Sequence, residues 1–288
     1  MPELPEVETV RRGLKDLITS RTVASIKSDN PKSFPNSPVD VKKFLIGATI
    51  QDINRRAKVL LIYLSTDYAL VIHLKMTGQL VFIGEKRFGA GHPTDSLIGR
   101  LPDRSTRVTI TFTDSSRLYF NDQRKFGWMW LLPIAEVPNI DFMKKVGPEP
   151  LEADFSAKQF AARFTQRANT IIKAVLLDQT VVAGIGNIYA DESLWSAKIH
   201  PGRLVKTITP KEFTTLYKKL RLIMNLAIEK GGSTDRNYVT AEGKKGSYLE
   251  FAQVFRREGL PCRRCQTTII KFKCAGRGTH ICPNCQVL

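Results

Sequence analysis

The sequence predicts an α+β protein of several domains: an N-terminal β-sandwich with flanking helices, a helical domain, and a small C-terminal β-hairpin that carries cysteines. Three observations lead to this prediction. Short β-rich runs separated by turn residues recur before residue 135, helical periodicity replaces them after residue 150, and all five cysteines fall at the C-terminal end. A chain of 288 residues is long enough for two sizeable cores and a small module.

Residues 1–135 are expected to form the β-sandwich. A helix should begin after Pro5 and continue to about Ile18. The expected strands are rich in β-branched, leucine and aromatic residues and cover 59–64, 69–73, 107–112, 117–120 and 128–132. Turn signals such as SerThrAsp at 65–67 separate them. Several short strands at this spacing are typical of a β-sandwich.

A change in composition at GPEPL (147–151) marks a linker, which we place at 136–150. A helical domain follows at 151–249, with helices expected at 156–165, 170–177, 188–197 and 210–230. Ser156 and Thr209 are suitable N-cap residues. A polar, glycine-containing segment from 233 to about 247 is expected to form a loop, and residues 250–288 form the last module.

The cysteines of this module have the spacing of a four-thiolate zinc site: Cys262-x2-Cys265, sixteen residues, then Cys282-x2-Cys285. Each Cys-x2-Cys turn can present two sulfurs to one face of a tetrahedral ion. One structural Zn²⁺ is therefore expected, and a closed site of four sulfurs leaves no position open for chemistry. Cys274 is left over, and because five is an odd number a full disulfide framework is not expected.

The net charge of +17 and the pI of about 9.8 indicate a polyanionic partner. Four thiolates with Zn²⁺ would lower the charge only to about +15. Nucleic acid is favoured over a membrane surface, because we find no basic amphipathic helix with an aromatic face. A basic but unspecialised surface is the alternative. The apolar runs are too short to span a bilayer, and MPELPEVETV is not a secretory signal, so a cytosolic protein is expected.

The N-terminus, taken alone, resembles an ordinary frayed tail. However, proline after the initiator Met permits removal of Met1, which frees a secondary amine. Such an amine condenses with an aldehyde carbon to give a charged iminium, a good electron sink for elimination. An α-amino group has a pKa of about 8, so it is partly neutral at physiological pH.

Seven motifs are distributed along essentially the whole chain, and their order along it is part of the pattern. They are MPELPEVETVRRGL, RRAK (55–58), HLKMTGQL (73–80), DQRKFG (122–127), GPEPL, IK-x2-LLDQ…VAGIGNIYADE (172–192) and GRGTHICPNCQ (276–286). By these motifs the chain resembles bacterial formamidopyrimidine-DNA glycosylases. The resemblance implies a helix–two-turn–helix domain and a bifunctional enzyme. Such an enzyme removes oxidised purines from duplex DNA and cuts the abasic strand by β,δ-elimination. It also implies a monomer that acts on damaged double-stranded DNA in the bacterial cytosol.

The resemblance implies the catalytic residues as well. Pro2 would attack C1′ of the deoxyribose, Glu3 would protonate the ring oxygen, and Glu6 would organise the proline. Lys58 would bind phosphate and donate a proton in β-elimination, and Arg277 would bind the phosphate that flanks the lesion and assist δ-elimination. These groups suit oxocarbenium formation and phosphate departure. The alternatives are ordinary helix N-terminal acids and a solvated loop arginine.

Chemistry at C1′ requires the damaged nucleotide to leave the base stack. The resemblance assigns Met76, Arg124 and Phe126 to the vacated space, with Arg124 facing the orphaned cytosine. For Met76 and Phe126 the alternative is a core position on adjacent strands. If 124–126 are extended, residues 124 and 126 share one face. The other candidates belong to phosphate-contact positions and to the lesion-capping loop: Lys173, Asn187, Arg104, Arg107, Arg167, Arg236, Tyr238 and Tyr248.

At two positions the sequence departs from the pattern of the family. Many family members have a KHxH or KHxR run where this chain has RSTR (104–107), so Arg104 or Arg107 would replace a missing His contact. Upstream of Lys173 the chain has few basic residues, with Arg167 the nearest. GIGN (184–187) lies between two expected helices, where a tight turn and free amides favour phosphate.

Two other functions remain open. One is an endonuclease VIII-like glycosylase for oxidised pyrimidines, against which Arg124 and Phe126 argue. The other is a catalytically silent protein that binds damaged DNA, against which Pro2, Glu3 and Lys58 argue.

Overall fold

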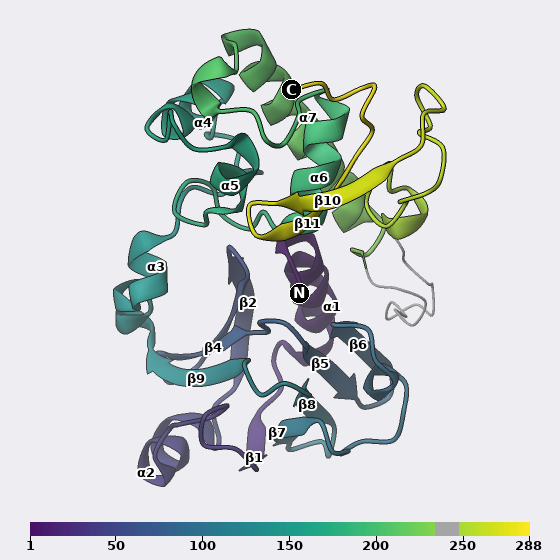
Figure 1. The fold of residues 1–288 in the computed structure, drawn as a ribbon. Coiled ribbons are helices and arrows are strands. Elements are labelled where there is room, and N and C mark those ends of the chain that lie inside the picture. Colours follow the sequence, from purple (N-terminus) through teal and green to yellow (C-terminus); the bar gives the residue numbers. More distant parts are fainter. Residues whose placement is uncertain (234–247) are drawn as a thin grey trace. The chain divides into compact units, whose positions relative to one another are not determined.

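The structure is a computed structural model that describes residues 1–233 and 248–288 (Figure 1). The chain divides into two compact units. The first holds Met1–Lys144 and the segment that begins at Lys230, and the second holds Lys145–Glu229 and Tyr248–Leu288. Within the described residues, no helix has both the length and the apolar character that crossing a membrane would require.

Two antiparallel sheets and the N-terminal helix make up the first unit. The five-stranded sheet has the order β1-β7-β8-β5-β6, and the four-stranded sheet has the order β2-β3-β4-β9. The strands are β1 Val23–Ser28, β2 Ile50–Arg56, β3 Val59–Leu64, β4 Tyr68–His73, β5 Gly78–Ile83, β6 Arg87–Gly91, β7 Thr106–Phe112, β8 Arg117–Asp122 and β9 Trp128–Pro133. Apolar residues of both sheets and of helix α1 (Leu4–Ile18) share one buried core, as the predicted β-sandwich requires.

Strand β3 shows why the run VLLIYL is apolar at nearly every position. Leu60 and Ile62 pack in the main core, whereas Val59 and Leu61 belong to a second apolar cluster. Successive side chains of a strand point to opposite faces, so a strand covered on both faces has no polar face. The second cover comes from η3 (Ile134–Asn139) and α3 (Asp141–Lys145).

All five predicted strand runs are present, and so is the N-terminal helix. The structure adds β1, β2, β5 and β6, which the sequence pattern did not reveal. Most residues of β1 are exposed or half-buried, and β6 has two glycines among five residues, so neither shows a clear apolar alternation. Short turns complete the chain: α2 Pro38–Asp40, η1 Val41–Leu45, η2 Asp95–Leu97, η4 Val205–Thr207 and η5 Tyr248–Glu250.

Helices dominate the second unit, as predicted. They are α4 Ala157–Thr165, α5 Ile172–Leu177, α6 Asn187–Ser196 and α7 Pro210–Glu229, followed by the hairpin β10 Ile270–Cys274 and β11 Arg277–Ile281. Both predicted N-caps are confirmed, because Ser156 Oγ accepts the Gln159 amide and Thr209 Oγ1 accepts the Glu212 amide, each at 3.2 Å. Aromatic side chains of α4 and α7 pack against one another.

Candidate active site and nucleic-acid interface

The start of helix α1 brings Pro2, Glu3 and Glu6 together. All three are buried, with Glu3 3% and Glu6 4% exposed. Glu6 Oε2 accepts a hydrogen bond from the Glu3 backbone nitrogen at 2.8 Å, which satisfies a donor near the helix start. The helix dipole also favours carboxylates here. The arrangement therefore suits both interpretations of the two acids, as helix caps and as a proton source beside Pro2 in the chain.

As long as Met1 precedes it, the nitrogen of Pro2 is an amide. An amide nitrogen has no available lone pair and cannot attack carbon. Met1 is 50% exposed, so its removal would free the nitrogen with little loss of buried surface.

Glu6 also fixes the backbone at 232–233. Its Oε1 accepts a hydrogen bond from the Ser233 amide at 2.7 Å. Gly232 has φ +84° and lies so close that a Cβ would meet Glu6 Cγ at 3.0 Å, so this position requires glycine. Glu6 thus connects the helix start to the point where the predicted lesion-capping loop begins. The loop candidates Arg236 and Tyr238 lie outside the described residues.

Lys58 lies in the two-residue turn between β2 and β3, where Ala57 has φ +53°. Only 4% of Lys58 is exposed. Burial and, to a smaller extent, the charges of Lys75 and Lys58 together lower the pKa of His73 to about 3. His73 is therefore neutral near pH 7, and its Nδ1 accepts the Lys75 amide at 3.0 Å. Positive charge here is carried by the lysines, which suits an oxyanion partner.

A network around Glu8 connects the Lys58 turn to helix α1. Arg55 Nε lies 3.2 Å from Glu8 Oε2, and Arg55 Nη1 donates to the carbonyl just before Lys58 at 2.9 Å. Burial raises the pKa of Glu8, but hydrogen bonds from Arg11 and Arg12 and the charges of Arg11 and Arg55 outweigh it and hold the pKa at about 2. Glu8 is therefore an anion at neutral pH. The sequence motifs included Glu8 and Arg55 but gave neither a role.

Met76, Arg124 and Phe126 form a cluster on the surface, which we call the wedge. Arg124 Nη1 lies 3.2 Å from Met76 Sδ, and the Arg124 guanidinium lies 4.8 Å from the centre of the Phe126 ring. Met76 is 37% exposed and Phe126 52% exposed. The alternative of two core residues is therefore wrong. An exposed apolar pair beside an arginine is instead suited to insertion between bases.

Asp122, which sequence reasoning did not select, organises this wedge. Its fully buried carboxylate accepts hydrogen bonds from the Gly127 amide at 2.6 Å, from the Arg124 amide at 3.2 Å, and from the Thr77 hydroxyl. Lys125 has φ +56°, so residues 124–126 form a turn and are not extended. The expectation that residues 124 and 126 share one face of an extended strand is therefore wrong. The turn nevertheless brings the Arg124 and Phe126 side chains together.

The two arginines of the RSTR run have different environments. Arg104 is exposed. Arg107 is 4% exposed; its guanidinium forms an ion pair with Asp29 and donates to the carbonyls of Ser105 and Asp122. A phosphate could reach Arg104 directly, whereas Arg107 is already used to fix the loop.

The second unit places Asn187 at the first position of α6, directly after the GIG turn. Gly184 has φ +80°, a conformation that a side chain would strain. Asn187 Nδ2 donates to the Gly278 carbonyl at 2.9 Å. Lys173 is fully buried, and its Nζ donates to Asp191 Oδ1 and Thr279 Oγ1, each at 2.6 Å. Contrary to the expectation of a phosphate contact, Lys173 does not reach the surface in this structure.

Arg277 is exposed and directly follows the two-residue turn of the β10–β11 hairpin. Arg167 is also accessible, with a side chain 54% exposed and a long ion pair of 3.8 Å to Asp178. Tyr248 is 1% exposed and donates its hydroxyl to Glu192 Oε2 at 3.1 Å. Of these three candidates, only the two arginines can meet a phosphate without rearrangement.

Four sulfurs within 4.8 Å of one another confirm the predicted metal site, formed by Cys262, Cys265, Cys282 and Cys285. Sulfurs bound tetrahedrally at 2.3 Å from zinc lie about 3.8 Å apart. Cys265 Sγ is 3.4 Å from Cys282 Sγ and 3.5 Å from Cys285 Sγ, so the donors fit one zinc ion. The Arg264 guanidinium stacks on Trp195 of α6 at 4.0 Å. Cys274 stands apart on β10, and burial raises the pKa of its thiol.

Comparisons with known proteins cover both units. Residues 1–129 match the formamidopyrimidine-DNA glycosylase N-terminal domain, 146–238 its H2TH domain, and 259–287 the zinc finger found in FPG and IleRS. The chain is 40% identical to the formamidopyrimidine-DNA glycosylase of Pelotomaculum thermopropionicum and 42% identical to that of Streptococcus pneumoniae, over 99% of each chain.

Solved structures give the same result. The Lactococcus lactis Fpg in complex with DNA containing an abasic site has a TM-score of 0.87 at 37% identity, covering 99% of this chain and 100% of that one. The same protein bound to N7-benzyl-Fapy-dG DNA has a TM-score of 0.87 at 36% identity and full coverage of both chains.

Proposed function

Because this chain belongs to the formamidopyrimidine-DNA glycosylase family, we propose that it is a base-excision repair enzyme for oxidised purines. Its substrates would be 8-oxoguanine and formamidopyrimidines in duplex DNA, and it would also cut the strand at the abasic site. One observation carries the proposal: Pro2, Glu3 and Glu6 share one buried helix start. We further propose a monomer in the bacterial cytoplasm.

The first step replaces the glycosidic bond. The freed nitrogen of Pro2 attacks C1′, and the bond from C1′ to the base nitrogen breaks with its electron pair. Glu3 supplies a proton to the ring oxygen as the sugar opens, and the departing base takes up a proton. The product is an iminium between Pro2 and C1′. A buried acid suits this role, since it delivers its proton where water is scarce.

Elimination follows from the iminium. Loss of a proton from C2′ breaks the C3′–O3′ bond, and loss of a proton from C4′ then breaks the C5′–O5′ bond. Each step releases a phosphate monoester, with electrons drawn toward the iminium. Lys58 serves the first departure and Arg277 the second, because each places a cation where negative charge develops.

Binding requires the lesion to leave the stack and the gap to be filled. The wedge supplies apolar atoms from Met76 and Phe126 and donors from Arg124 for the orphaned base. Arg104 and Arg167 are exposed cations suited to phosphate. Zinc bound by four thiolates supplies only structural support, since no coordination position is left for substrate.

The decisive experiment is borohydride trapping on a duplex with 8-oxoguanine opposite cytosine. Protein whose N-terminus is verified as Pro2 by mass spectrometry should form a covalent complex. The same chain with Met1 retained is the matched control and should form none. Pro2→Gly should slow turnover by about 100-fold while binding changes little, because a misplaced nucleophile costs rate rather than affinity.

Specificity is tested on a second duplex. Thymine glycol should be excised more slowly than 8-oxoguanine opposite cytosine; the reverse order would identify an oxidised-pyrimidine glycosylase. Equal trapping by the Met1-retained chain would rule out Pro2 as the nucleophile.

A further inference from the structure

A cluster of buried polar residues lies behind the Arg277 hairpin. Lys173 comes from α5, Asp191 from α6, and Thr279 and His280 from β11. Their exposed fractions are 0%, 1%, 0% and 3%, respectively. Buried charges are costly unless they are paired and hydrogen-bonded, so such a cluster calls for a physical explanation. Neither the catalytic residues nor the zinc site includes it.

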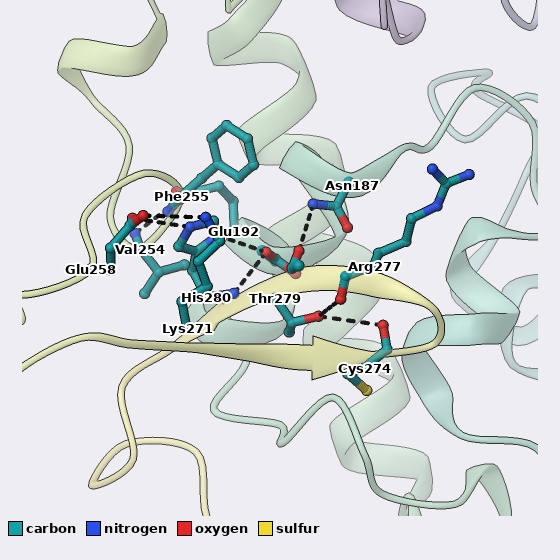
Figure 2. Close-up of polar contacts among 12 residues, drawn as sticks. Asn187, Glu192, Val254, Phe255, Glu258, Lys271, Cys274, Arg277, Thr279 and His280 are labelled. Atoms are coloured by element: carbon teal, nitrogen blue, oxygen red, sulfur yellow. Dashed lines mark hydrogen bonds and ion pairs between the residues drawn. The ribbon is translucent and has the colours of Figure 1, made fainter.

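The cluster acts on the hairpin through the Thr279 hydroxyl. Lys173 Nζ, held by Asp191 Oδ1 at 2.6 Å, donates to Thr279 Oγ1 at 2.6 Å. An ammonium has donors only, so the hydroxyl proton of Thr279 is free to point elsewhere. Thr279 Oγ1 lies 3.1 Å from the carbonyl oxygen of Arg277 and 3.5 Å from that of Cys274, the two residues that flank the turn (Figure 2). The buried ammonium therefore orients a hydroxyl that closes the turn.

Two more contacts hold the neighbouring backbone. Asn187 Nδ2 donates to the Gly278 carbonyl at 2.9 Å, and Asp191 Oδ2 accepts the His280 amide at 3.0 Å. On the other side His280 Nε2 lies 3.1 Å from Glu258 Oε2 (Figure 2). Arg277, Gly278 and His280 thus each have a backbone group bound by a side chain of the helices or of β11 itself.

Zinc alone cannot fix this end of the hairpin. Cys282 follows Arg277 by five residues, which at about 3.3 Å per strand residue is some 16 Å. The metal holds one end of β11 and the buried cluster holds the other. The exposed Arg277 side chain projects from the end that the cluster holds (Figure 2).

We propose that Lys173, Asp191, Thr279 and Asn187 are positioning residues for Arg277, and that Lys173 acts through the interior rather than as a phosphate ligand. This inference rests on the proposed function, because it assigns Arg277 to the second elimination. The cluster limits the turn to one conformation. The guanidinium therefore reaches the departing phosphate without first being ordered, which raises the rate of that step.

The test is a double-mutant cycle between Thr279 and Arg277 on a duplex with a preformed abasic site. Thr279→Val keeps the volume and removes the hydroxyl, whereas Thr279→Ser keeps the hydroxyl. One lost hydrogen bond should slow δ-elimination about fivefold in Thr279→Val, with β-elimination and borohydride trapping unchanged. Thr279→Ser should restore the rate. In an Arg277→Ala background, Thr279→Val should have no further effect.

Zinc content and thermal unfolding of each variant control for folding. A second variant, Asn187→Ala, removes the hydrogen bond to the Gly278 carbonyl without disturbing a buried charge. It should slow δ-elimination only when Arg277 is present. If its effect persists in Arg277→Ala, Asn187 binds phosphate directly and its positioning role is overturned. The positioning role of the cluster is overturned if Thr279→Val has the wild-type rate of δ-elimination. It is also overturned if Thr279→Val slows this step by the same factor in the Arg277→Ala background as in the wild type. A wild-type chain that traps no DNA overturns the proposed function itself, and this inference with it.

Discussion

Two buried aspartates, Asp122 and Asp191, stabilise the turns that carry the surface residues Arg124 and Arg277, and they do so in different ways. Asp122 binds neutral donors, the Thr77 hydroxyl and the amides of Arg124 and Gly127, all close to the turn itself. Asp191 instead binds a cation, the ammonium of Lys173, together with the amide of His280. The first turn is fixed by hydrogen bonds from neutral donors, and the second by an ion pair inside the unit.

This difference predicts how each turn can be broken. A buried carboxylate with neutral donors loses a few hydrogen bonds when it is changed. A buried carboxylate with a cationic partner leaves an uncompensated charge. The Arg277 turn also has the zinc ligand Cys282 directly beyond the far end of its strand.

Removal of zinc should have the largest effect. Structural zinc in finger peptides contributes about 10–16 kcal/mol to apparent stability. A strong chelator should therefore abolish amide protection in β10 and β11, while protection in β7 and β8 stays as it was. Hydrogen exchange with and without chelator measures this, and the metal released gives the stoichiometry. Equal loss in both regions would contradict a metal effect confined to the second unit.

Asp191→Asn should have the second-largest effect. It should lower the free energy of unfolding by about 3–5 kcal/mol, because Lys173 remains fully buried without a counter-charge. Asp122→Asn is the matched control and should cost about 1–3 kcal/mol, the range for an unsatisfied buried hydrogen-bonding group. Denaturant unfolding of both variants gives the comparison. The charge argument fails if Asp122→Asn proves as costly as Asp191→Asn.

Acid should weaken the first unit in two stages. The pKa of His73 is about 3 against an ordinary 6.5, so the unfolded chain binds its proton first and stability falls as the pH drops below about 6.5. The pKa of Glu8 is about 2 against 4.5, so its contribution is full above 4.5 and is lost toward pH 2. Thermal unfolding at pH 7.5, 5.5, 4 and 3 measures both. His73→Gln should flatten the curve between pH 6.5 and about 3, while the Glu8 contribution below pH 4.5 remains. An unchanged slope between pH 6.5 and 4.5 would exclude His73 as its source.

Local patterns were enough to predict much of this molecule. Helix α1, strand β3 and the four zinc cysteines follow from periodicity and spacing, and hydrogen bonds between near neighbours stabilise the caps at Ser156 and Thr209. Lys173 is the opposite case. A lysine in a helical stretch is normally solvated, and its burial depends on Thr279, 106 residues further along the chain. No local pattern contains that partner, so nothing in the sequence corrected the family resemblance, which placed Lys173 on a DNA phosphate.

The exposure of the wedge could not be deduced from periodicity either, because Met76 and Phe126 follow strands and resemble core residues. Only the turn at Lys125, with its positive φ, lifts Phe126 out of the sheet. The buried Asp122 that makes this turn possible gives no signal beyond its place in the DQRKFG motif.

Phe126→Ala should have the smallest effect on stability, within about 0.5 kcal/mol, since an exposed side chain away from the core contributes little. Its effect should appear only with DNA, where a lost wedge weakens binding to a lesion duplex by about tenfold, the scale of one stacking contact. Phe251→Ala, at 40% exposure against 52%, is the control for exposed aromatic area in the other unit. Equal loss of affinity in both variants would mean that apolar area alone matters. A loss confined to Phe126 would mean that the turn held by Asp122 places the ring where a base has left.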